Sequence, residues 1–141
     1  MNPIYLAVLA AVSFGLWTVF HKVASPYINQ IFGAIIVSFV AVIVGLIVLL
    51  PRFKHIQLMS DWKGIFFVAL AGIAAFFIDY LALSAYGKGL PVSVGGPIII
   101  GGSIALASII GFFMGESVSL LKIIALILII GGSGMLAYLS K

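Results

Sequence analysis

The sequence predicts an all-α membrane protein with five transmembrane helices. Apolar residues make up 65% of its 141 residues and charged residues only 7%, whereas a soluble domain has about 45–50% apolar and about 25% charged residues. The apolar residues also gather into stretches close to the roughly 20 residues that a helix needs to cross the hydrocarbon core. These five stretches are residues 4–24, 31–50, 64–86, 91–114 and 120–139.

An odd number of crossings places the two termini on opposite sides of the membrane. A second copy, fused or separate, can then insert in the opposite orientation, which is how inverted-repeat transporters are built. We therefore expect residues 1–141 to form a single five-helix domain that is one half of an inverted-repeat transporter. The connections between the stretches are short, the longest being about residues 51–63, so the function must reside within the membrane.

The positive charges divide almost evenly between the two sides. The side that holds the N-terminus carries Arg52, Lys54, Lys63 and Lys122, and the opposite side carries Lys22, Lys88 and Lys141. Orientation follows an asymmetry of Lys and Arg, and this chain offers little. Two interpretations remain open, namely dual topology with antiparallel pairing, and a single orientation set by the cluster within residues 52–63.

Composition also disfavours several classes of function. The chain contains no Cys, hence no disulfide, no thiolate metal site and no Cys nucleophile. Its three acidic residues and two His form no metal-ligand cluster and no Ser–His–acid constellation at one depth. The formal charge of +4 fits loops that face lipid headgroups better than a nucleic-acid surface. We therefore predict a protein that is not an enzyme, holds no metal or other cofactor and binds no nucleic acid.

The first stretch carries a polar and aromatic face. No positive region precedes it, so it is predicted to be a retained helix rather than a signal peptide. Ser13, Trp17 and His21 recur every four residues and share one face. Trp17 lies too deep for an interfacial belt, and it either stacks on a planar or cationic ligand or packs against a neighbouring helix. His21 either relays protons to Asp79 or, like the neighbouring Lys22, lies at the interface.

The third stretch contains an acidic residue, Asp79, roughly 6 Å from the bilayer centre by helical rise. An ionised Asp there costs at least about 2.5–3.5 kcal/mol on insertion scales. Gly72, Ala75, Ala82 and Tyr86 share its helical face, and these mostly small residues direct Asp79 into the bundle. Asp79 is either a titratable group that binds a proton, a cation or substrate, or a hydrogen-bonded residue that locks two helices together. It is the strongest single candidate for a functional residue.

The fourth stretch opens with a Gly pair, Gly95 and Gly96, followed by Pro97. These residues weaken a helix where it enters the membrane. Two interpretations that are compatible with each other remain: an interrupted helix that offers backbone groups to a substrate, and an ordinary proline kink between closely packed helices. Further along, the small residues at positions 101, 105 and 108 form a face that permits close helix packing.

The last stretch ends in a glycine seam made of Gly131, Gly132 and Gly134, which we expect at a dimer contact. Glu116 lies between the fourth and fifth stretches. Its carboxylate either interacts with the N-terminal dipole of the fifth helix or acts as a gate residue that pairs across the mouth.

Several motifs occur in a characteristic order. The linker after the fourth stretch reads Gly115-Glu116-Ser117-Val118-Ser119, and residues 125–132 read Ala-Leu-Ile-Leu-Ile-Ile-Gly-Gly. The junction at residues 85–93 reads Ala-Tyr-Gly-Lys-Gly-Leu-Pro-Val-Ser, and near the N-terminus Trp17 precedes Lys22. In this order and spacing, the chain resembles the EamA-like drug/metabolite transporters, with Ala in place of the first Gly of the last helix pattern.

The resemblance implies a secondary transporter or exporter of small metabolites or drug-like compounds, placed as a multi-pass protein in a prokaryotic inner membrane. We expect alternating access, coupled to protons through Asp79, with substrate bound near the midplane between the first, third and fourth helices. The residues expected to bind substrate or proton are Ser13, Trp17, His21, Asp79, Tyr86, Gly96 and Pro97. The residues expected at helix ends or gates are Lys22, Lys88 and Glu116.

The expected partners are a small-molecule substrate, membrane lipid, and either a second copy of the chain or a paralogue in an antiparallel dimer. Two alternative functions remain: a membrane subunit that serves only in assembly, and a lipid flippase of the same architecture.

Overall fold

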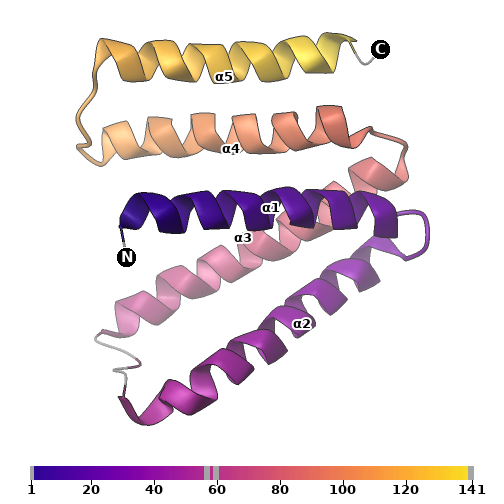
Figure 1. The fold of residues 1–141 in the computed structure, drawn as a ribbon, viewed down its shortest axis with the longest axis vertical. Helices are drawn as coiled ribbons and strands as arrows, with labels where there is room; N and C mark the ends of the chain where they lie inside the picture. Colours follow the sequence, from indigo (N-terminus) through magenta and orange to yellow (C-terminus); the bar gives the residue numbers. More distant parts are fainter. Residues whose placement is uncertain (1, 56–57, 59–60, 140–141) are drawn as a thin grey trace. The chain divides into compact units, whose positions relative to one another are not determined.

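The computed structural model describes residues 2–55, 58 and 61–139, and the regular secondary structure of this part of the chain is entirely helical. Its elements are α1 (Pro3–Ala24), α2 (Gln30–Leu49), the short 3₁₀ helix η1 (Leu50–His55), α3 (Trp62–Gly87), α4 (Val92–Phe113) and α5 (Leu120–Leu139) (Figure 1). The five α-helices of the described residues are each long and apolar enough to span a membrane. Their bounds agree with the predicted stretches to within two residues, and the predicted fold class is confirmed. Lys141, one of the predicted loop charges, lies outside the described residues.

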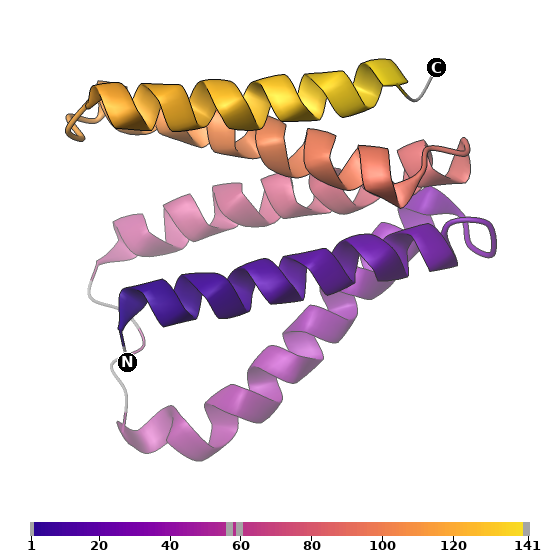
Figure 2. The ribbon, with the colours of Figure 1, turned by 45° about the horizontal axis from the view of Figure 1, so that its top comes forward.

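The chain divides into two compact units. The first comprises Met1–Phe20 and Gly89–Lys141, and the second comprises His21–Lys88. In the first unit α4 and α5 lie side by side as a hairpin, and in the second unit α2 packs against α3 (Figure 2). Helix α1 contributes to both units, because its first eighteen residues belong to the first unit and its last turn belongs to the second.

Small residues allow the two helices of each hairpin to approach closely. A Cβ atom built on Gly101 of α4 would overlap the Ser133 hydroxyl of α5 and lie 3.0 Å from the Ser133 Cβ. A Cβ atom on Gly33 of α2 would lie 2.7 Å from the Leu83 Cδ1 of α3. The predicted packing face that begins at Gly101 is therefore confirmed at its first position.

Polar residues define where several helices begin and end. The Asn29 side chain accepts hydrogen bonds from the backbone N–H groups of the first turn of α2, and Asp61 accepts one from the Lys63 N–H at the start of α3. Helix α4 ends just before Gly115, whose φ of +91° is readily adopted only by glycine. The Glu116 N–H then donates to the Gly111 carbonyl at 3.1 Å, so this linker forms a Schellman-type end.

Helix α4 is continuous through Pro97 from Val92 to Phe113. Of the two interpretations of this stretch, the structure therefore does not support the interrupted helix. Pro97 lies only six residues into α4, where it removes a single N–H that would have donated to the carbonyl of Ser93. The following residues continue the helical hydrogen bonding, so one proline at this place does not end the helix.

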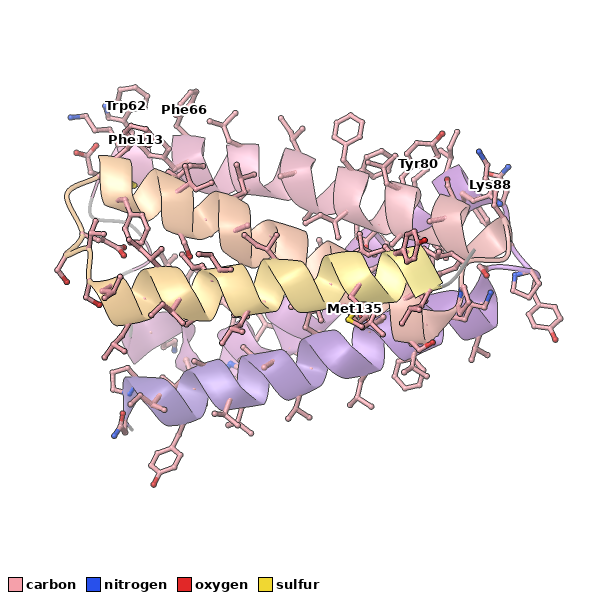
Figure 3. The ribbon with its side chains drawn as sticks, turned by 90° about the horizontal axis from the view of Figure 1, so that it is seen from above. Trp62, Phe66, Tyr80, Lys88, Phe113 and Met135 are labelled. Carbon is pink, nitrogen blue, oxygen red and sulfur yellow. The ribbon has the colours of Figure 1, made fainter. Side chains whose placement is uncertain are left out.

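Large apolar side chains cover the outside of the helices. Trp62 and Phe66 project from the first turns of α3 with 68% and 52% of their surfaces exposed, and Phe113 at the end of α4 is 89% exposed (Figure 3). An outer surface of this kind is stable against hydrocarbon and unfavourable in water. The few buried polar groups therefore belong to helices whose outer faces suit a lipid environment.

Candidate functional site

A buried contact between a histidine and an aspartate joins α1 to α3 in the second unit. The Nε2 atom of His21 lies 3.1 Å from the Oδ1 atom of Asp79, and the two side chains are only 4% and 9% exposed. His21 lies in the last turns of α1, whereas Asp79 lies two turns before the end of α3. The sequence places these residues on separate helices without fixing their distance, and the structure brings them together.

The buried face of α3 covers only its C-terminal half. Asp79, Ala82, Leu83 and Tyr86 are all buried, and their spacing places them on one side of the helix. Gly72 and Ala75, predicted to continue this face toward the N-terminus, are exposed in the structure. The predicted small-residue face is therefore packed only from Asp79 onward, which is where the polar residues lie.

Two lysines lie at the C-terminal end of α3. The Nζ of Lys22 donates a hydrogen bond to the backbone carbonyl of Tyr86 at 3.1 Å. A cation at this end is favourable, because the last carbonyls of a helix have no partners within the helix and carry its negative dipole end. Lys88 is the C-cap residue of α3, and its backbone N–H donates to the Ser84 carbonyl. Its side chain is exposed at this end of the helix (Figure 3).

The phenol of Tyr86 is the least accessible polar side chain of this cluster. Tyr86 is only 1% exposed, and its hydroxyl has no hydrogen-bond partner among the described residues. A buried hydroxyl without a partner costs about 1–3 kcal/mol. This group therefore requires an explanation other than packing.

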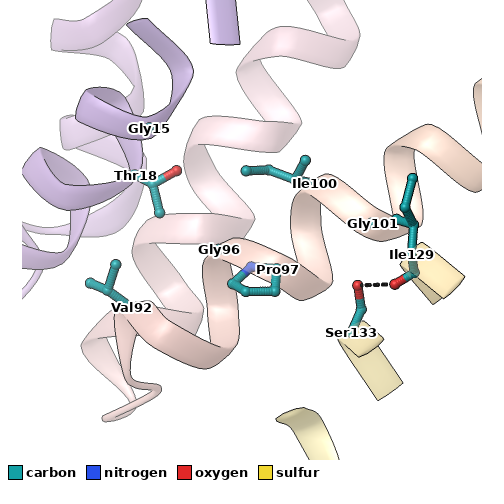
Figure 4. Close-up of a pocket in the computed structure, with 9 residues that line it drawn as sticks. All are labelled: Gly15, Thr18, Val92, Gly96, Pro97, Ile100, Gly101, Ile129 and Ser133. Carbon is teal, nitrogen blue, oxygen red and sulfur yellow. Dashed lines mark hydrogen bonds between the residues drawn. The ribbon is translucent and has the colours of Figure 1, made fainter. Parts of the chain in front are cut away.

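The first unit contains a cavity of about 370 Å³ (Figure 4). Helices α1, α4 and α5 all contribute to its wall, which is mostly apolar and contains no charged residue. The lining residues are Gly15, Thr18, Val92, Gly96, Pro97, Ile100, Gly101, Ile129 and Ser133. Gly96 and Pro97, both predicted to contact substrate, therefore line this cavity.

The two hydroxyl groups in the cavity wall already have acceptors within their own helices. Thr18 donates to the Phe14 carbonyl at 3.0 Å, and Ser133 donates to the Ile129 carbonyl at 2.8 Å (Figure 4). The wall therefore presents mainly methyl, methylene and glycine Cα groups. Such a surface suits an apolar part of a small molecule.

The buried face of α1 differs from the predicted stripe. Ser13 is exposed and donates to the Leu9 carbonyl of its own helix, and Trp17 stacks on Phe14 with ring centroids 4.9 Å apart. Neither Ser13 nor Trp17 lines the cavity. The fully buried polar residues are instead Thr18, His21 and Ser25.

The spacing of these three residues could have been found in the sequence. Thr18, His21 and Ser25 are separated by three and four residues, which follows a helical face more closely than a strict interval of four. The cavity residues Ile100 and Ser133 were also not predicted, because an Ile and a Ser within apolar helices carry no distinguishing pattern.

Glu116 packs back against α4. A Cβ atom on Gly111 would lie 3.0 Å from the Cδ of the Glu116 carboxylate, so glycine at position 111 leaves room for this side chain. The predicted dimer seam of α5 is uncovered: Gly131, Gly132 and Gly134 are exposed, and a Cβ atom on each would meet no atom within 4 Å in the described structure. Within the described ranges, no three His, Cys, Asp or Glu residues come together as a metal site.

Comparison with known proteins identifies the family. A search of curated proteins and a search of solved structures each return no match to this chain. The sequence does match the EamA-like transporter family over residues 1–138. Together with five membrane-spanning helices, this match describes an integral, multi-pass membrane transporter of small molecules. The chain therefore belongs to the EamA-like transporter family.

Proposed function

We propose that this protein is a proton-coupled secondary transporter that moves small amphipathic metabolites or drug-like compounds by alternating access. The observation that carries the proposal is the buried His21–Asp79 pair, with its 3.1 Å contact between two membrane-spanning helices. Ionisable residues inside membrane helices are costly, and they commonly form proton or ion pathways. Asp79 is the acidic member of this pair and would carry the coupling proton.

The geometry provides a way for a proton to change the conformation. An ionised Asp79 attracts His21 and holds the last turns of α1 against α3. Protonation removes the negative charge and so weakens the attraction, although the neutral carboxyl can still form a hydrogen bond with His21, and the Lys22 amine keeps its bond to the Tyr86 carbonyl. Protonation thus changes the relative free energies of two positions of α1, and alternating access requires such a change.

We assign the apolar part of the transported compound to the cavity of the first unit. Its volume of about 370 Å³ lies within the range of roughly 300–1,000 Å³ found for small-molecule sites. The uncharged wall, with both hydroxyls bonded to their own helices, favours an apolar group over an ionic one. This wall supports a substrate that has an apolar part.

The test is compound-driven proton movement in liposomes that contain the purified protein and an enclosed pH-sensitive dye. Aromatic amines and amides serve as probes, and we expect some of them to change the internal pH. Gly15→Leu adds a side chain at a position that lines the cavity, where a Cβ meets no atom within 4 Å. It should weaken the apparent affinity about tenfold or more, equivalent to about 1.4 kcal/mol.

Gly102→Leu is the matched control for this experiment. Gly102 is also open to substitution, but it does not line the cavity. Equal effects of the two substitutions would contradict the assignment of the cavity. If no probe moves protons while an added ionophore does, the proposed transport function is wrong, and an assembly subunit or a lipid flippase would have to be considered.

We also propose that the working unit is an antiparallel dimer of two five-helix chains, either two copies or a copy with a paralogue. The near-even distribution of Lys and Arg and the uncovered glycine seam of α5 support this arrangement. A reporter fused after residue 141 should then be detected on both faces of a bacterial inner membrane, where we expect the protein to reside. Detection on a single face would exclude the dual-topology homodimer.

A further inference from the structure

The Tyr86 side chain is buried in the second unit, and several donors of that unit bond to backbone carbonyls. Tyr86 is 1% exposed, and its hydroxyl has no partner among the described residues. The amine of Lys22 bonds to the backbone carbonyl of Tyr86 rather than to its phenol. The hydroxyls of Ser25 and Ser84 donate to the carbonyls of Lys22 and Tyr80, respectively. These donors are therefore engaged with backbone acceptors.

The phenol shares one face of α3 with Asp79. Tyr86 follows Asp79 by two turns of α3, and both side chains are buried on the same side. Long side chains in a helix lean toward its N-terminus, which is the direction from Tyr86 to Asp79. The face thus combines a buried carboxylate, paired with His21, and a buried O–H donor.

We propose that the Tyr86 hydroxyl donates a hydrogen bond to an acceptor oxygen or nitrogen of a small molecule that binds within the second unit, and that the class of compound bound there is neutral small molecules with a carbonyl, amide or hydroxyl group. The inference rests on the proposed transport function. Neutral acceptors are favoured because an anionic group would approach the Asp79 carboxylate on the same face. The hydroxyl is unfavourable in the ligand-free protein and becomes satisfied when the compound binds.

This assignment predicts opposite effects of one substitution on stability and on binding. Tyr86→Phe removes the hydroxyl and keeps the ring, so the ligand-free variant should unfold at the wild-type temperature or above it. Its affinity for acceptor-bearing compounds should fall about tenfold. A residue with a purely structural role would not separate these two measurements.

The experiment measures the shift in unfolding temperature of the purified, membrane-embedded protein with four probes that share one aromatic ring. Acetophenone and benzyl alcohol carry an acceptor, whereas benzylammonium and toluene do not. We expect the acceptor-bearing probes to stabilise the wild type, and Tyr86→Phe to lose that stabilisation. Tyr80→Phe on the same helix is the control, because Tyr80 lies outside the buried face (Figure 3). It should respond like the wild type.

Several outcomes would overturn the inference. It is wrong if neither acceptor-bearing probe stabilises the wild type, or if Tyr86→Phe binds them as the wild type does. A lower unfolding temperature of ligand-free Tyr86→Phe would show that the hydroxyl has a partner within the protein, and a changed oligomeric state would place that partner in a second copy. Absence of compound-driven proton movement in the wild type would instead refute the proposed function, so the two failures are distinguishable.

Discussion

Asp79→Asn is expected to abolish pH-driven transport while the protein remains folded and membrane-inserted. Asn has nearly the same shape and can still accept a hydrogen bond from His21, so the 3.1 Å contact between these helices has a neutral replacement. It cannot gain or lose a proton in the physiological range. The coupling step is therefore removed, and compound-driven proton movement in liposomes should fall to the level of liposomes without protein.

Asp61→Asn is the matched control for this prediction. Asp61 is an exposed acid that caps α3 through the Lys63 N–H, and Asn caps a helix equally well. This variant loses the same formal charge outside the membrane-spanning part of the helix, and it should transport like the wild type. Full coupled transport by Asp79→Asn would show that the proton is carried elsewhere.

Gly101→Val is expected to cause the largest loss of stability. The new Cβ would overlap the Ser133 hydroxyl and lie 3.0 Å from the Ser133 Cβ, which is fixed close to the α5 backbone. The hydroxyl must rotate away or shift, and because the Ser133 Cβ is attached directly to the α5 backbone, the helices of the α4–α5 hairpin must also give way slightly. Overpacking of this kind costs about 1–3 kcal/mol or more. The measurement is the midpoint of unfolding in mixed micelles of increasing denaturing detergent.

The neighbouring residue provides the control. Gly102→Val makes the same chemical change one position along α4, where a Cβ would meet no atom within 4 Å. Its unfolding midpoint should lie close to that of the wild type. Equal loss in both variants would attribute the effect to the β-branched side chain in the helix rather than to contact with α5.

The helices were predictable because bilayer thickness determines their length. Stretches of about 20 apolar residues leave little freedom for other boundaries, because Asn29 and Asp61 cap the starts of α2 and α3 and Gly115 follows the end of α4. The effect of Pro97 was less predictable, because its consequence depends on its distance from the start of the helix. One lost N–H near the first turn is tolerated, and α4 continues.

The residues of the candidate site could be identified from the sequence, but the contacts between them could not. The sequence marks Asp79 and His21 as unusual within apolar helices, and it orders them on helical faces. Their 3.1 Å contact depends on how α1 lies against α3, which no periodicity within a single helix determines. Thr18 was not predicted for a related reason. The expected face of α1 was one residue out of register, so Trp17 was expected where the structure buries Thr18.

Helix α1 is one continuous element from Pro3 to Ala24, and this continuity has a thermodynamic consequence. Thr18 forms part of the cavity wall, and His21, three residues later, pairs with Asp79. Three residues correspond to a rise of about 4.5 Å, so a rotation of the helix that moves one of them also moves the other. If proton binding at Asp79 alters the affinity of the cavity by some factor, occupation of the cavity must alter proton affinity by the same factor.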